Sequence, residues 1–286
     1  MNNLFVNPIE YLPRLPLGEW VDIFIDWLLL HIGAITRFIS NFLEGIMGSI
    51  TDGLMWFPPF ILILLISLAA WRLSNRGVAI FTFLGLILIY NMQLWLPALS
   101  TITMILIAVT ISIAIGLPVG ILSTRSVVFH RIVWPILDFM QTMPAFVYLI
   151  PAVFFFRLGV VSAMIATVVF SMPPVIRLTG LGIRQVSEEV VEASKAFGST
   201  DWQLLTKVQL PLAMPTIMAG VNQCIMLALS MVVIAAMIGA GGLGGHVYGA
   251  IQRLNIGLGF ESGLAVVILA IILDRITQSS RQREEE

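Results

Sequence analysis

Charge is scarce in this sequence: 11% of its 286 residues are Asp, Glu, Lys or Arg, whereas 58% are hydrophobic. A soluble domain carries about twice that charged fraction, because charged side chains coat its surface. The mean hydropathy of +0.99 instead predicts an integral membrane protein in contact with lipid. A net charge of −1 provides no strong positive field, so we expect no nucleic-acid partner.

Cysteine and histidine are also rare. The single cysteine, Cys224, cannot form an intrachain disulfide and is expected to be a small buried hydrophobic residue. His31, His130 and His246 are far apart and lack the spacing of metal ligands, so no metal site is expected. The N-terminal residues show no basic segment before an apolar core, so we expect no cleavable signal peptide and insertion through internal helices.

Long uncharged runs predict about seven membrane-spanning helices, because each crossing needs about 20 mainly apolar residues. Together they define an all-α membrane domain at 53–278, followed by a charged tail at 279–286. The uncharged runs are 53–71, 77–124 (long enough for two spans with a turn near 90–97), 139–156, 158–176 (after a hinge at 157–159) and 212–238; a last, short span is predicted near 263–276, where the uncharged residues run only as far as Asp274.

Residues 1–52, before the first predicted span, have a different pattern. Between Glu19 and Ile50, apolar residues such as Trp20, Phe24 and Trp27 recur at three- and four-residue steps. This pattern predicts an amphipathic helix that lies in the membrane interface on the external side. The alternative is an additional span through 23–35, which would have to carry Asp26 and His31 into the membrane.

Basic residues predict the orientation through the positive-inside rule. An external N-terminus and a cytoplasmic C-terminus place eleven of the 15 basic residues on the cytoplasmic side. These eleven are Arg72, Arg76, Arg125, Arg131, Arg177, Arg184, Lys195, Lys207, Arg275, Arg281 and Arg283.

The longest internal polar segment on the cytoplasmic side, at about 186–211, predicts two short helices. Ser187 is expected to cap the first helix, which begins with two glutamates that suit the helix dipole, and Gly198 is expected to end it. Thr200-Asp201-Trp202-Gln203 has the pattern of a capping box that opens the second helix, which is expected to run to Pro211.

Short helices of this kind are only marginally stable alone. The four apolar residues expected at their surface, Val190, Phe197, Trp202 and Leu205, need a partner. From physics alone, that partner is either a separate protein or the chain's own spans.

The motif spacing in this loop resembles a known family. Glu192-Ala193-Ser194, three residues, Gly198, nine residues and Val208-Gln209-Leu210-Pro211 resemble the EAA loop of ABC importer permeases, E-A-A-x3-G-x9-I-x-L-P. Only Ser194 and Val208 depart from that pattern, both conservatively. The resemblance implies the type I ABC importer permease fold and a loop that couples to a nucleotide-binding subunit. The implied coupling positions are Glu192, Ala193, Ser194, Gly198, Val208, Leu210 and Pro211.

The segments 135–156, 228–244 and 273–278 are similar to the glycine betaine/proline-type permeases of osmoprotectant importers. This similarity covers roughly 12–278. It implies uptake of glycine betaine or a related quaternary ammonium compound across a bacterial inner membrane. Choline, carnitine and proline remain alternative substrates.

The same resemblance implies a set of partners rather than chemistry on this chain. The implied partners are two copies of an ATPase subunit, an external substrate-binding protein, a second copy of this permease and membrane lipid. Catalytic residues and cofactors are not expected here, because ATP and Mg²⁺ belong to the ATPase. A secondary transporter or channel would show inverted repeats or a filter motif, and a membrane enzyme would show clustered catalytic groups; neither pattern is found.

Polar and aromatic residues within the predicted spans are candidates for the translocation pathway, since aromatic faces attract quaternary ammonium groups and intramembrane polar groups usually face the bundle interior. For the aromatic residues the alternative is packing in the core or against lipid, and for the amides it is a helix–helix hydrogen bond. Pro144, Pro151, Pro173 and Pro174 indicate either broken or kinked helices, and the glycine run 239–245 indicates a tight turn or gate rather than a phosphate-binding loop. The pathway candidates are Asp138, Gln141, Phe146, Tyr148, Asn222 and Gln223.

Overall fold

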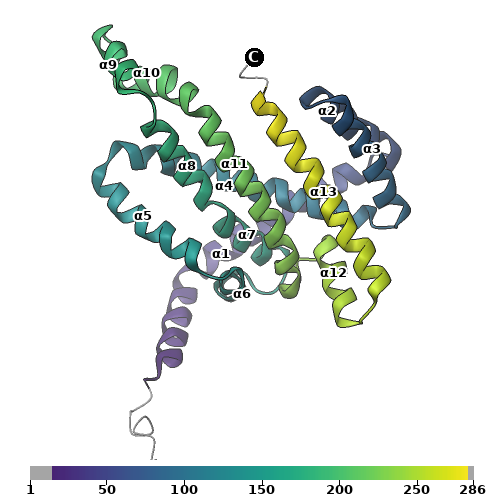
Figure 1. Ribbon diagram of the computed structural model, residues 1–286. Coiled ribbons are helices and arrows are strands. Elements are labelled where there is room, and N and C mark those ends of the chain that lie inside the picture. Colours follow the sequence, from purple (N-terminus) through teal and green to yellow (C-terminus); the bar gives the residue numbers. More distant parts are fainter. Residues whose placement is uncertain (1–14, 283–286) are drawn as a thin grey trace, which may run out of the picture.

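A computed structural model describes residues 15–282, and this part of the chain is helical throughout, without a β-strand (Figure 1). The beginning of the predicted N-terminal segment and the end of the predicted tail lie outside the described residues. The prediction of an all-α membrane protein is confirmed. The helices are α1 (Leu17–Met55), α2 (Pro59–Leu73), α3 (Arg76–Asn91), α4 (Trp95–Arg125), α5 (Val127–Thr142), α6 (Leu149–Phe156), α7 (Val160–Ser171), α8 (Pro173–Arg184), α9 (Glu188–Ala196), α10 (Asp201–Leu204), α11 (Leu210–Ala235), α12 (Gly242–Gln252) and α13 (Ile256–Gln282).

Five stretches of helix in the described chain are long and apolar enough to cross a membrane, and a bent pair makes a sixth. They are α1, α4, α7 with α8, α10 through α11, α13, and the bent pair α5–α6. The predicted first two spans correspond to α2 and α3, whose 15 and 16 residues reach only about 24 Å. The hydrocarbon core is about 30 Å thick, so the count of seven spans is not confirmed.

Helix α1 is a single helix of 39 residues, in agreement with the predicted N-terminal helix. Much of its apolar surface is exposed, and only its C-terminal half contributes to the core, through the buried Leu43. By length and composition it also qualifies as a span. Its position in the membrane interface therefore stays a prediction.

The predicted span at 139–156 is broken rather than merely kinked, because the chain bends by 114° between α5 and α6. Met143 and Pro144 have extended backbone at this break, with ψ of 133° and 142°. A residue that precedes proline disfavours the helical conformation, so the helix ends there. Pro151 lies in the first turn of α6 and Pro173 opens α8, positions where the missing proline N–H costs no helical hydrogen bond.

The predicted turn near 90–97 and the hinge at 157–159 are both found. The first lies between α3 and α4, and in the second Arg157 and Gly159 have positive φ angles of 66° and 144°.

The glycine run turns at Gly239–Gly241 and then enters α12. The backbone N–H of Leu243 donates to Thr101 Oγ1 at 2.9 Å, which fixes this turn against α4.

The core lies where α4, α7, α8 and α11 pack together, and Cys224 is fully buried there, as predicted. Small residues allow the helices to approach closely, as is common in membranes. A Cβ on Gly120 would lie 2.9 Å from the Ile176 carbonyl oxygen, and one on Gly220 would lie 3.0 Å from the Pro174 carbonyl oxygen. These contacts bind α8 tightly between α4 and α11.

Helix α13 is longer than the predicted run 263–276. The predicted span was short because the uncharged run between Glu261 and Asp274 is short. In the structure both lie inside the helix, so these charges do not mark its termini.

Candidate functional site

Helices α9 and α10 project beyond the bundle at one end of the molecule, at the upper left of Figure 1. Helix α9 begins after Ser187, where predicted, but the Ser187 side chain forms no cap hydrogen bond, so that detail of the prediction is wrong. Glu188 and Glu189 in the first turn stabilise the helix dipole instead. After α9 the chain turns at Gly198, whose φ is +80° and whose N–H donates to the Lys195 carbonyl oxygen at 2.9 Å.

The predicted capping box is present at the start of α10. The Gln203 N–H donates to Thr200 Oγ1 at 3.3 Å, and the Thr200 N–H donates to Gln203 Oε1 at 2.9 Å. These reciprocal bonds satisfy two N–H groups that would otherwise lack partners. The beginning of the second short helix was therefore predictable from the sequence.

The predicted end of that helix at Pro211 is wrong. Helix α10 continues through a π-helical turn, Leu205–Gln209, directly into α11. The Leu210 N–H donates to the carbonyl oxygen of Leu205, five residues earlier. Proline lacks an N–H and would clash with a carbonyl oxygen four residues earlier, and the wider π turn accommodates it. The projecting loop is thus joined rigidly to a long membrane helix.

The motif residues fall into two groups in space. Glu192, Ala193 and Ser194 lie on α9, and the Ser194 hydroxyl donates to the Ser199 hydroxyl at 2.9 Å across the turn. Gly198 forms the turn itself. The second group, Val208, Leu210 and Pro211, lies where the π turn enters α11.

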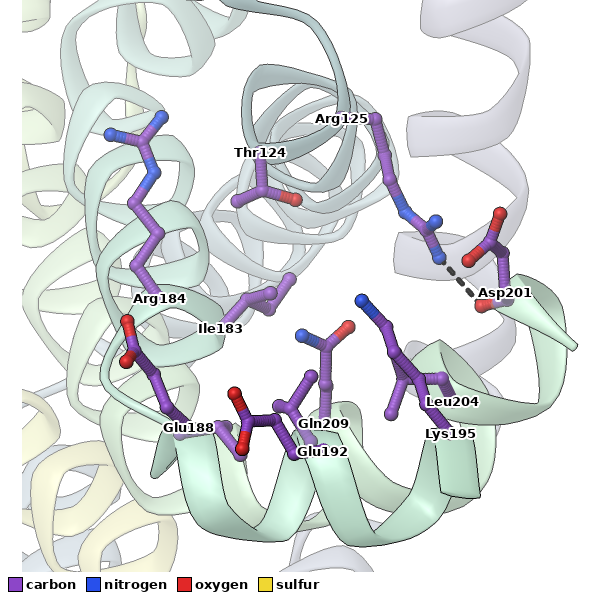
Figure 2. A pocket seen from close by; sticks show the side chains of 12 residues that line it. Thr124, Arg125, Ile183, Arg184, Glu188, Glu192, Lys195, Asp201, Leu204 and Gln209 are labelled. Carbon is purple, nitrogen blue, oxygen red and sulfur yellow. Dashed lines mark hydrogen bonds between the residues drawn. The ribbon is translucent and has the colours of Figure 1, made fainter. Parts of the chain in front are cut away.

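A cleft of about 530 Å³ separates these helices from the ends of α4 and α8 (Figure 2). Its charged side chains have both signs. Across it, Arg125 Nη2 donates to the Asp201 carbonyl oxygen at 2.8 Å and ties α4 to the beginning of α10. The lining residues are Thr124, Arg125, Ile183, Arg184, Val186, Glu188, Val191, Glu192, Lys195, Asp201, Leu204 and Gln209.

The outer face of α9 and α10 is apolar and uncovered by the described chain. Phe197 is 92% exposed and Trp202 is 71% exposed, and Val190 is exposed as well. Leu205 was predicted to share this face, but it is buried beside Ile183 and Ala213. The loop therefore packs on its own spans through Leu205 and presents Phe197 and Trp202 outward.

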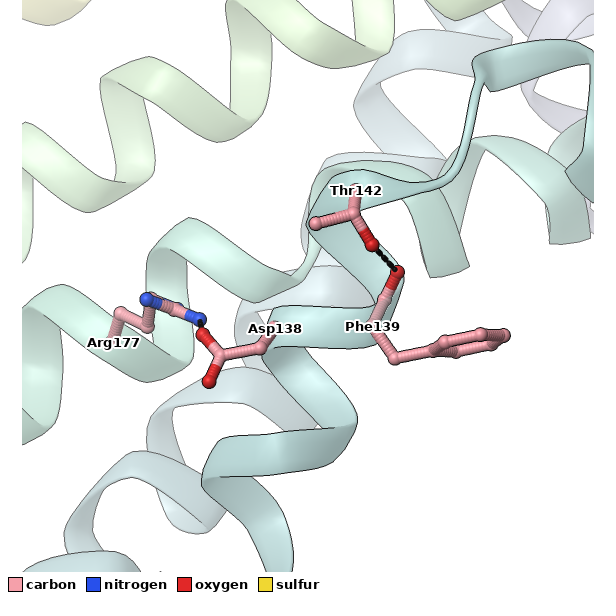
Figure 3. Close-up of polar contacts among 4 residues, drawn as sticks. All are labelled: Asp138, Phe139, Thr142 and Arg177. Carbon is pink, nitrogen blue, oxygen red and sulfur yellow. Dashed lines mark hydrogen bonds and ion pairs between the residues drawn. The ribbon is translucent and has the colours of Figure 1, made fainter.

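The pathway candidates do not converge on one site. Asp138 on α5 pairs with Arg177 on α8, and Arg177 Nη2 donates to Asp138 Oδ1 (Figure 3). Gln141 is exposed one turn beyond Asp138 on the same helix. Near it, the Thr142 hydroxyl donates to the Phe139 carbonyl oxygen at 2.9 Å and closes the end of α5.

The other candidates are dispersed over neighbouring helices. Phe146 is exposed, whereas Tyr148 is buried, with its hydroxyl donating to the Met140 carbonyl oxygen and its ring 5.5 Å from that of Phe170. Asn222 Oδ1 on α11 accepts a hydrogen bond of 3.1 Å from the Thr277 hydroxyl on α13. This is the helix–helix hydrogen bond that was the alternative to a pathway role for Asn222. Gln223 is exposed.

Three residues of the α5–α8 contact were missed as site residues by the sequence reasoning: Trp134, Arg177 and Arg184. The guanidinium carbons of Arg177 and Arg184 lie 5.8 and 5.5 Å from the centre of the Trp134 ring. The sequence does contain a signal for these residues. Arg177 and Arg184 are seven residues apart on α8, and Trp134 and Asp138 are four residues apart on α5. Each pair therefore shares one helix face.

Residues 116–283 match the model of the family described as "Binding-protein-dependent transport system inner membrane component". The chain is 50% identical to the glycine betaine transport system permease protein OpuAB of Bacillus subtilis, covering 97% of this chain and 98% of that protein. It is 48% identical to the glycine betaine/carnitine transport permease protein GbuB of Listeria monocytogenes, covering 95% and 98% of the two chains.

The permease protein ProW of the Escherichia coli glycine betaine/proline betaine transport system is 47% identical, covering 93% of this chain and 75% of that protein. Among solved structures, an inward-facing form of the MetNI methionine ABC transporter matches with a TM-score of 0.58 at 24% identity. That match covers 66% of this chain and 93% of the other. It confirms the predicted type I importer permease fold.

Proposed function

The chain belongs to the family of binding-protein-dependent transport system inner membrane components, and we propose that it is the permease subunit of an ATP-driven importer of glycine betaine. The observation that carries this proposal is the near-full-length similarity to proteins named as glycine betaine permeases. Its substrate-binding protein lies outside the membrane and its ATPase subunits lie in the cytoplasm, where they hold ATP and Mg²⁺.

The coupling surface consists of α9, α10 and the π turn. In this proposal Phe197 and Trp202 enter a groove of the ATPase, since exposed aromatic residues of this size are typical anchors of protein interfaces. Glu192, Ala193 and Gly198 set the shape of the first helix and its turn. Val208, Leu210 and Pro211 join the surface to α11.

Rigid connections support a transmission role for this surface. Helix α10 is continuous with α11 through the π turn, and Arg125 joins it to the end of α4. When two ATPase subunits close on ATP, the movement of α10 shifts both membrane helices together. The spans then alternate between inward-facing and outward-facing arrangements, and a loaded binding protein supplies substrate to the outward-facing one.

The orientation follows from the same assignment. An ATPase at α9 and α10 requires this end of the molecule to lie in the cytoplasm. We propose that the N-terminus lies outside and the C-terminus inside. The basic residues Arg125, Arg184 and Lys195 around the cleft agree with this orientation under the positive-inside rule.

Uptake by the whole complex tests this function. The chain, its ATPase and its binding protein are reconstituted in proteoliposomes with internal ATP, and uptake of labelled glycine betaine, carnitine and choline is compared. We expect ATP-dependent accumulation of glycine betaine, abolished by Glu192→Lys, which reverses a charge on α9. ATP-dependent uptake of none of the three compounds would contradict the function, and normal uptake by Glu192→Lys would contradict the coupling role.

A further inference from the structure

Helices α5 and α8 carry opposite charges on facing sides. Arg177 on α8 pairs with Asp138 on α5, and Trp134 lies one turn before Asp138. Arg177 is seven residues, or about 10 Å, from Arg184 at the end of α8. The Arg177–Asp138 pair therefore lies away from the cleft beside α9 and α10, and Arg177 is on a helix that qualifies as part of a membrane span.

Arg177 was predicted on the cytoplasmic side, but it lies inside a candidate span, where a charged group is costly and needs a reason. Helix α8 is already held by close contacts with α4 and α11 on its other side, through Gly120 and Gly220. The pair contributes little to that packing, because α5 touches α8 only sparsely. The pair lies on the side of α8 that faces away from α4 and α11, which indicates a role other than holding the bundle together.

Arg177 has unused binding capacity in this structure. Only Nη2 reaches Asp138, whereas Nε is buried and has no hydrogen-bond partner among the described residues. A guanidinium binds a carboxylate best through two parallel N–H groups, so the contact with Asp138 is not its optimal one. The Asp138 side chain is 62% exposed, and Figure 3 shows it pointing toward Arg177 from α5.

We propose that the Arg177–Asp138 pair is a binding subsite for a zwitterion within the translocation pathway. The carboxylate of the substrate displaces Asp138 and takes two N–H groups of Arg177. The released Asp138 carboxylate then faces the quaternary ammonium group, one methylene group away from the substrate carboxylate. A site with no net charge thus exchanges its internal ion pair for two ion pairs with a ligand that has no net charge.

Trp134 gives the subsite its fixed geometry. Its ring lies against both Arg177 and Arg184, which limits the movement of the Arg177 guanidinium when Asp138 leaves it. The Arg184 side chain also contacts His130 and donates to the Ser123 carbonyl oxygen at 2.9 Å, so this side of Trp134 is anchored to α4.

The proposed chemistry predicts a preference that rests on the proposed function. Glycine betaine satisfies both charges, whereas choline has the quaternary ammonium group but no carboxylate. Choline would separate Asp138 from Arg177 and leave the guanidinium unpaired, which is unfavourable. The subsite therefore favours passage of zwitterions over cations.

The test measures glycine betaine transported per ATP hydrolysed in the reconstituted complex. For Arg177→Gln we expect uptake to fall at least tenfold, while ATP hydrolysis stimulated by the loaded binding protein stays within twofold of wild type. The matched control is Arg131→Gln, which removes the same charge from an exposed position on α5 and should leave both rates unchanged.

The double variant Arg177→Met with Asp138→Leu separates this role from a structural one. An apolar pair can replace an ion pair without loss of stability. A purely structural pair would be rescued by the double variant, with normal uptake, and that result would overturn the subsite. Parallel loss of uptake and ATP hydrolysis in Arg177→Gln would overturn it too. Failure of the wild-type complex to import glycine betaine would instead contradict the proposed function.

Discussion

At Gly198 the backbone has a φ of +80°, which costs an L-residue with a side chain about 1–2 kcal/mol. A Cβ at this position would meet no atom within 4 Å, so the cost of a side chain here is conformational rather than steric. The turn is also closed by the Gly198 N–H, which donates to the Lys195 carbonyl oxygen. Gly198 thus sets the angle between α9 and α10.

Replacing Gly198 by proline should abolish uptake. Proline fixes φ near −65° and removes the donor to Lys195, so α9 and α10 cannot keep their relative orientation. Gly198→Asn should retain most uptake, because asparagine tolerates positive φ and keeps the N–H. Labelled glycine betaine uptake and co-purification of the ATPase measure both variants. Equal activity of the proline and asparagine variants would contradict the importance of this turn.

We expect helices α9 and α10 to act as one docking element, because their exposed aromatic residues lie on either side of the Gly198 turn. Phe197 and Trp202 are among the most exposed apolar side chains of the described chain. Neither contributes to the buried clusters of the permease, so removing them should not destabilise it.

Phe197→Ala and Trp202→Ala should each weaken ATPase binding by about 2 kcal/mol or more, roughly thirtyfold in Kd. The thermal stability of the isolated permease should not change. Phe260→Ala is the matched control, since Phe260 is 70% exposed but lies near the beginning of α13, away from the coupling loop. Affinities of the detergent-solubilised permease for the ATPase measure the effect. Loss of affinity in the control alone would place the docking surface elsewhere.

Local signals in the sequence predicted several of these elements correctly. The Thr200–Gln203 capping box and the Gly198 turn depend on side chains within a few residues of each other, so their patterns are visible in the sequence. The Met143–Pro144 break was predicted only as one of two alternatives, a broken or a kinked helix, because Pro144 signals an interruption while the apolar run continues through it.

Other features depend on contacts that no local pattern contains. Pro211 was taken as a helix end, but a π turn lets the helix pass it. Leu205 was expected at the surface, and its burial depends on Ile183 and Ala213 from other parts of the chain. The pairing of Asp138 with Arg177 joins residues 39 positions apart and required the packing of α5 beside α8.

At the scale of the whole molecule, the described chain leaves polar side chains uncovered on its membrane helices. Gln141 and Gln223 are exposed, and the Asp138 side chain is 62% exposed. Lipid would not satisfy these groups, whereas a protein interface or a water-filled pathway would. We therefore expect a second copy of this chain to cover these groups and to complete the pathway.

Two copies of this chain should be present in each assembled complex. Forms carrying different affinity tags are co-expressed with the ATPase, and the complex is isolated through the first tag. We expect the second tag in the isolated complex, and native mass spectrometry should give equal numbers of permease and ATPase chains. Membranes that express each tag separately and are mixed after solubilisation show whether copies exchange. Complexes with two ATPase chains and one permease chain would contradict the homodimer, and the exposed Asp138 and Gln223 would then require another protein to cover them.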